Sequence, residues 1–140
     1  MKTLHSGRRL GVLVFAALVA AGACSSGESS SKAKTPEEVR APASEVTAGL
    51  KKIQGIVEQV TAATVSGEQA RAEDLDAQIE PTWQKIEGTV KANDQDAYVT
   101  FEDSFALIKG AVKSKDGAQA SKGAADVDAT VKRYLATYPG

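Results

Sequence analysis

The stretch SEVTAGLKKIQGIVEQV, residues 44–60, decides the fold class. Its large apolar residues recur at alternating steps of four and three, at Val46, Leu50, Ile53, Val57 and Val60. This spacing places them on one face of an α-helix, and Ser44 stands where an N-cap residue is expected. Because a helix with one apolar face is stable only when that face packs against another element, the rest of the chain must supply partners.

Three further segments have the same periodicity. We call the apolar residues on one helix face a stripe. The second stripe follows Ser66 and comprises Ala72, Leu75, Ile79, Trp83, Ile86 and Val90. The third follows Asp94, its expected N-cap, and comprises Tyr98, Phe101, Phe105, Ile108 and Val112. The fourth follows Asp116 and Gly117 and comprises Ala120, Ala124, Val127, Val131, Tyr134 or Leu135, and Tyr138. No segment shows the alternation of apolar and polar residues that is typical of a strand.

Loops as short as Ala92–Asp94 and Ser114–Asp116 join these segments, and short loops make neighbouring helices antiparallel. We therefore expect an all-α fold, an antiparallel up-and-down four-helix bundle over residues 43–140. Pro81 interrupts the second segment. Either the helix runs through Pro81 with a kink, at a cost of about 3 kcal/mol, or it breaks at Ile79–Glu80 and Pro81 becomes the first residue of a new helix.

The first 23 residues have the pattern of an export signal. Lys2, Arg8 and Arg9 precede an apolar run from Leu10 to Ala21, which is shorter than the roughly 20 residues needed to span a bilayer. The Arg8–Arg9 pair also occurs in twin-arginine signals, so the export route stays open between the general and the twin-arginine pathways. The run leads to Cys24, the only cysteine, which rules out a disulfide within the chain.

The residues Ala21-Gly22-Ala23-Cys24 resemble the lipobox of bacterial lipoproteins, although that family usually has Leu where this chain has Ala21. The resemblance implies cleavage before Cys24 and a diacylglycerol on its thiol. Acyl chains such as palmitate would then anchor the protein at the extracytoplasmic face of the cell membrane. The alternative is ordinary cleavage after Ala23, which leaves a free thiol. Residues 24–42 would form a flexible linker, because SSGESSSKAK from Ser25 has too little apolar surface to offset the entropy of ordering.

Cleavage before Cys24 would remove His5 and Met1, the only histidine and the only methionine. It would also lower the count of Lys and Arg from 17 to 14 against 18 Asp and Glu, a net charge of −4, which does not favour nucleic-acid binding. Without an imidazole or a free thiolate we expect no enzyme of the Ser-His-Asp or Cys-His kind. Copper and zinc prefer those same ligands, so any bound metal should be a hard cation such as Fe³⁺, Ca²⁺, Mg²⁺ or Mn²⁺.

Acidic residues border two of the apolar stripes. At about 100° per residue, Asp76, Glu80 and Glu87 fall along a single edge of the second stripe. Glu102 flanks the third stripe in the same way, and Asp103 points further out. In antiparallel neighbours Glu87 and Glu102 would come together, and two like charges in proximity favour a cation between them.

We therefore predict a metal site that comprises Glu87, Glu102, Glu80, Asp103 and Asp76, with Trp83 and Tyr98 as a ligand platform. The alternative is a solvated flank in which Lys109 neutralises Glu102 and Trp83 belongs to the core.

Three motifs in these helices carry a family resemblance: W-x-x-I-E-G-x-V-K from Trp83, D-x-Y from Asp96 and F-E-D from Phe101. Together they resemble the small extracytoplasmic helical proteins that accompany bacterial iron-uptake permeases, over about Pro81 to Pro139. The R-E-x-x-E and H-x-x-E iron motifs of those systems are absent from this chain. The resemblance implies iron handling with a membrane permease as partner, and it points to Glu87 and Glu102. The alternative function is a structural or protein-interaction lipoprotein without a ligand.

Overall fold

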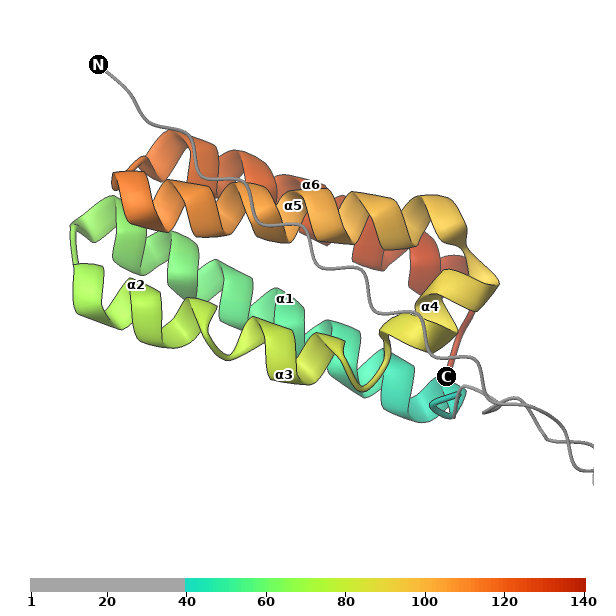
Figure 1. Ribbon diagram of the computed structural model, residues 1–140. Helices are drawn as coiled ribbons and strands as arrows, with labels where there is room; N and C mark the ends of the chain where they lie inside the picture. The colour runs from blue at the N-terminus through green and yellow to red at the C-terminus, as the bar shows by residue number, and fades with distance from the viewer. Residues whose placement is uncertain (1–39) are drawn as a thin grey trace, which may run out of the picture. The chain divides into compact units, whose positions relative to one another are not determined.

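The computed structural model describes residues 40–140. The predicted signal (1–23), Cys24 and most of the predicted linker lie outside the described residues. The described part contains six α-helices and no strand, so the all-α prediction is confirmed (Figure 1). The helices are α1 (Ala43–Ser66), α2 (Gln69–Asp76), α3 (Ile79–Trp83), α4 (Glu87–Asn93), α5 (Gln95–Ser114) and α6 (Gly117–Thr137). In residues 40–140 no helix has both the length and the apolar character needed to cross a membrane.

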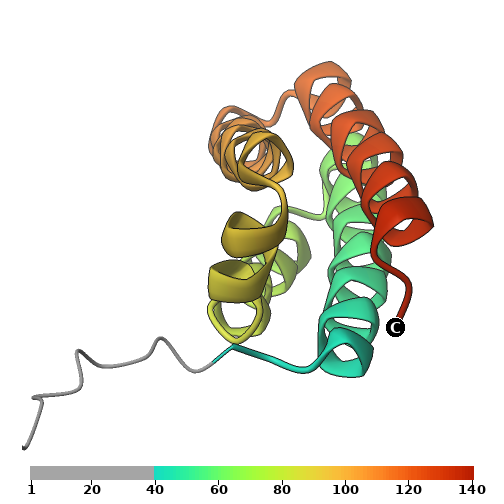
Figure 2. The same ribbon diagram turned by 90° about the vertical axis from the view of Figure 1, so that its right-hand side faces the viewer.

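The three long helices, α1, α5 and α6, form most of the structure. The most extensive helix contacts join α5 to α6, α1 to α6 and α1 to α2. The short helix α3 packs on α1, and α4 packs on α5. Viewed from its end, the described part has α1, α6, α5 and the α3–α4 segment around a common interior (Figure 2).

The four predicted apolar stripes form this interior. All five residues of the first stripe are at most 2% exposed, and Trp83, Phe101 and Tyr134 are the largest side chains that are fully buried. Some predicted members only border the core: Leu75, Tyr98, Phe105, Ala124, Leu135 and Tyr138. The helical periodicity therefore identified the buried face of each segment correctly.

Of the two predicted N-caps, Asp94 is confirmed and Ser44 is not, and Asp116 caps α6 in the same way as Asp94 caps α5. The Asp94 carboxylate accepts a hydrogen bond from the backbone N–H of Ala97 (2.8 Å), and Asp116 accepts from Ala118 and Gln119 (both 3.0 Å). The prediction for Ser44 is wrong, because α1 begins at Ala43 and its N-cap is Pro42, with no side-chain cap. Proline enters the helix from an extended conformation (φ −58°, ψ 151°), and its carbonyl accepts the first intrahelical bonds.

The predicted second helix is three short helices rather than one. The first break lies at Ala77–Gln78, two residues before the predicted position, and Pro81 is the third residue of α3. Proline is tolerated there, because the N–H groups of the first helical turn have no partner within the helix. A second break at Gln84–Ile86 contains no proline and was not predicted. Across these breaks Ile79, Trp83, Ile86 and Val90 all stay within 3% exposure, so the breaks keep all four side chains in the core.

Candidate functional site

Trp83 organises the predicted site from inside the core. Its indole is fully buried, and the rings of Phe101 and Phe105 lie 5.2 and 5.4 Å from it. Its Nε1 donates a hydrogen bond to Oε1 of Glu102 over 2.6 Å. A hydrogen bond to a carboxylate is short and strong, so Trp83 holds Glu102 at the rim of the core. Trp83 is thus a core residue whose polar edge orients a predicted ligand.

Three of the predicted carboxylates affect the pKa of the Tyr98 hydroxyl. Its ring stacks on Trp83 with 6.0 Å between centroids, and Nζ of Lys91 lies 5.0 Å from the Tyr98 centroid. The negative charge of Glu102 is the largest cause that raises the pKa of the Tyr98 hydroxyl above its usual value. Partial burial, the charges of Glu87 and Glu80, and a hydrogen bond with Glu102 add to this effect. The charges of three carboxylates, on α3, α4 and α5, therefore act on one phenol.

A pocket of about 250 Å³ opens beside this group, between the α2–α3 segment and α5. Its apolar lining consists of Ala77, Ile79, Phe105 and Ala106. Its charged lining consists of Asp76, Glu80, Glu102 and Lys109. Of the five predicted metal ligands, three line the pocket, Glu87 lies outside its lining near Tyr98, and Asp103 is exposed on α5.

Lys109, which neutralises Glu102 in the solvated-flank alternative, forms no ion pair with Glu102 in the described residues. In residues 40–140 it forms no ion pair, and its charge acts on Asp76 instead. Burial raises the pKa of Asp76, and the charges of Lys109 and Lys113 partly oppose that increase. Glu80 accepts a hydrogen bond from Nε2 of Gln84 (2.9 Å).

The oxygen atoms that could act as metal ligands in this region belong to carboxylates and a phenol, and hard cations prefer such ligands. However, the part of the chain from Arg40 onward contains no group of three or more Asp, Glu, His or Cys residues that could hold a metal ion. The structure does not bring the five predicted ligands together around one point. A metal ion here would need Tyr98 or water in addition to carboxylates.

The sequence pattern contained a signal for the pocket that the prediction did not use. Glu102, Phe105, Ala106 and Lys109 stand at positions i, i+3, i+4 and i+7, which share one face of a helix. That face forms the α5 wall of the pocket. The opposite wall depends on the break at Ala77–Gln78, which periodicity does not reveal.

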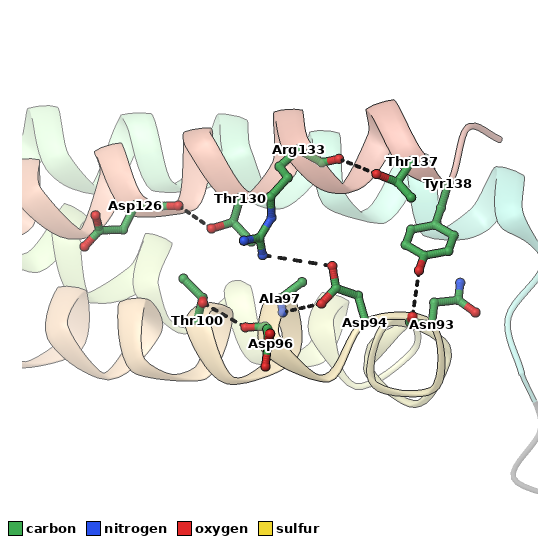
Figure 3. A network of polar contacts seen from close by, with 10 residues as sticks. All are labelled: Asn93, Asp94, Asp96, Ala97, Thr100, Asp126, Thr130, Arg133, Thr137 and Tyr138. Carbon is green, nitrogen blue, oxygen red and sulfur yellow. Dashed lines mark hydrogen bonds and ion pairs between the residues drawn. The ribbon is translucent and has the colours of Figure 1, made fainter.

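A polar network joins the α4–α5 corner to α6 (Figure 3). The Tyr138 hydroxyl donates to the backbone carbonyl of Asn93 (2.7 Å), and Nδ2 of Asn93 donates to the Tyr134 hydroxyl (2.9 Å). Arg133 lies 4.0 Å from the capping carboxylate of Asp94. Tyr134 and Tyr138 thus fix a corner of the fold.

Comparison of the chain with protein families, with curated proteins and with solved structures gives no match.

Proposed function

We propose that this chain is a lipid-anchored extracytoplasmic protein that serves as a non-enzymatic binding or accessory module at the cell membrane. Its ligand would be a hard cation such as Fe³⁺, handled for a membrane uptake permease. The observation that carries the proposal is the Glu102 carboxylate, which Trp83 holds at the rim of a pocket that Asp76 and Glu80 also line. Residues 25–140 contain no histidine and no cysteine, which supports a binding role rather than nucleophilic catalysis.

Calorimetric titration of the full chain with Fe³⁺, Mn²⁺ and Ca²⁺ tests the cation site. We expect heat of binding for at least one ion, and its loss in the double variant Glu87→Gln, Glu102→Gln. Asp126→Asn is the matched control, because Asp126 is an acidic residue of α6 that pairs with Lys122 away from this group. Absence of heat, or heat that the double variant retains, would refute the site.

Fatty-acid labelling of the protein and of its Cys24→Ser variant tests the lipid anchor. Cells that express the chain and receive a labelled fatty acid should incorporate the label, and the protein should be found in the membrane fraction. Cys24→Ser should abolish both results, since serine provides no thiol for the diacylglycerol. An equal membrane fraction for both forms would contradict the anchor.

A second candidate function is a protein-interaction module that binds no small ligand. It is favoured because residues 40–140 contain no group of three metal-ligating side chains, and because Glu102 is already bonded to Trp83. A pull-down with membrane proteins would test this candidate. Recovery of no permease or other membrane protein beyond what an unrelated lipoprotein recovers would count against it.

We also propose that the fold is an antiparallel up-and-down bundle in which α2, α3 and α4 together take the place of one helix. The contacts of α2 with α1 and α5 support this arrangement. Spin labels at Glu73 and Lys113 should be much closer together than labels at Glu73 and Asp96. Asp96 and Lys113 are 17 residues apart on α5, which corresponds to about 25 Å. Equal distances would refute the antiparallel order.

A further inference from the structure

The pocket between α2–α3 and α5 differs in charge between its two ends. Glu80 and Glu102 lie at the same end, because Trp83, three residues after Glu80, is bonded to Glu102, whereas the start of α2 lies at the far end of α5, where Gln69 bonds the Val112 carbonyl. At the other end Lys109 lines the pocket, and Lys113 is near enough to act on Asp76. The lining of that end therefore has one ammonium group and one carboxylate, with Lys113 outside the lining, whereas the first end has two carboxylates; the Lys109 end is the more positive end.

The charged groups of the positive end are not paired with each other. Asp76 and Lys109 both line the pocket, yet they form no ion pair, and neither has a hydrogen-bond partner in residues 40–140. Between the ends lie the apolar side chains of Ile79 and Phe105. A bare metal ion is a poor occupant of the whole pocket, since the Lys109 ammonium repels it and the apolar lining offers it no ligand.

The size of the pocket also fits an organic molecule. A volume of about 250 Å³ is that of about eight water molecules at about 30 Å³ each. Glu102 and Lys109 are seven residues apart on α5, so their Cα atoms differ by about 10 Å along the helix. A molecule of eight or nine non-hydrogen atoms with one charge at each end spans this separation.

We propose that this pocket binds a small zwitterion, with its ammonium between Glu80 and Glu102, its hydrocarbon chain on Ile79 and Phe105, and its carboxylate at Lys109. The inference rests on the proposed binding function but replaces the metal ion with an organic ligand class. An ω-amino acid such as 6-aminohexanoate has this chemistry.

Calorimetry on the full chain with 6-aminohexanoate, hexylamine and hexanoate tests the proposal. We expect 6-aminohexanoate to bind about tenfold more tightly than either single-charge analogue, because only it satisfies both ends of the pocket. Lys109→Gln should remove the advantage over hexylamine, and Glu80→Gln should reduce the advantage over hexanoate. Lys51→Gln is the control, because it removes an equally exposed lysine of α1 that does not line the pocket.

Equal affinities for the three probes, or equal effects of Lys109→Gln and Lys51→Gln, would overturn the proposal. A parallel titration with Fe³⁺ separates it from the proposed function. Binding of Fe³⁺ without 6-aminohexanoate refutes the zwitterion and leaves the metal function standing, whereas the reverse result refutes the metal. Binding of neither refutes both. All variants replace exposed residues, and a circular-dichroism melt of each verifies that it is folded.

Discussion

Glu102 is the residue that connects the core to the candidate site. It accepts a short hydrogen bond from buried Trp83, it acts on the Tyr98 hydroxyl, and it lines the pocket. A carboxylate fixed by a buried donor presents its second oxygen in a defined direction. This gives the site one preorganised group, which reduces the cost of binding a ligand there.

Glu102→Gln should lower the pKa of Tyr98. The phenolate is disfavoured chiefly by the negative charge of Glu102, so a neutral side chain of similar shape makes ionisation easier. An alkaline titration followed by the ultraviolet absorbance of tyrosinate measures the change, and Tyr98→Phe assigns the signal among the three tyrosines. Asp103→Asn is the neighbouring control, and a Tyr98 titration unchanged in Glu102→Gln would contradict the geometry.

Asp76→Asn should stabilise the fold at neutral pH. Burial raises the folded-state pKa of Asp76 above the ordinary 3.8, so its charged form is disfavoured in the folded protein. The stabilisation by the variant should be present above the folded-state pKa and vanish as the pH falls below 3.8, where the carboxyl is protonated in both states. Thermal melts at neutral and acidic pH measure it. A variant that is less stable than the parent at neutral pH would show that the carboxylate has a stabilising partner.

The sequence could identify the acidic residues near the site but not how they combine. Helical periodicity placed Glu80 and Glu102 beside the apolar stripes, and both line the pocket. It placed Asp103 further out, and Asp103 is exposed on α5 although it was included among the predicted ligands. Rotation angles along an ideal helix cannot give the relation of side chains on different helices, nor the bond that ties Glu102 to Trp83.

At the level of elements, α6 packs closely on α5 at Gly123. A Cβ atom at this position would lie 2.6 Å from Cγ1 of Ile108 and 3.2 Å from the carbonyl oxygen of Ser104. Gly110 of α5 has nothing within 4 Å of such an atom. The two glycines therefore form a matched pair on neighbouring helices.

Gly123→Ala should destabilise the protein by about 1–3 kcal/mol, because α5 and α6 must separate or Ile108 must change its conformation. Gly110→Ala should stabilise it by about 0.5–1 kcal/mol through helix propensity alone. Urea unfolding of both variants measures the free energies. A similar change for the two would show that α5 and α6 do not approach closely at Gly123.

The starts of α5 and α1 differ in their N-caps, and substitutions at Asp94 and Ser44 compare them. Asp94→Ala should cost about 1 kcal/mol of unfolding free energy, because it removes the bond to the Ala97 N–H at the start of α5. Ser44→Ala should have almost no effect, because Ser44 makes no cap at the start of α1. Chemical denaturation measures both, and an equal loss in the two variants would place the start of α1 at the predicted Ser44 cap.

Element type was easier to predict than element continuity. The apolar stripes identified every helical segment, because burial of one face dominates helix stability in a folded protein. A break near Pro81 was one of two alternatives, but the break at Gln84–Ile86 was missed, because the side chains of Trp83, Ile86 and Val90 keep a helical spacing even though the backbone between them is broken.

For the whole molecule, the buried side chains of residues 40–140 form one hydrophobic core. The fragment 35–140 should therefore melt at the same temperature as the full chain, within about 2 °C, since a 1 kcal/mol difference would shift a domain of this size by about 4–8 °C. Differential scanning calorimetry of the two proteins measures this. A lower melting temperature for the fragment would show that the N-terminal residues contribute to folding stability.

The position of Trp83 gives the chain an optical reporter of its own. It is the only tryptophan, so its fluorescence can be excited selectively, and its indole is shielded from solvent. The Nε1–Glu102 bond couples that emission to the charge at the pocket rim. A metal ion or an ammonium group that neutralises Glu102 will change the electric field at the indole and shift the emission, so occupancy can be followed in the unlabelled protein.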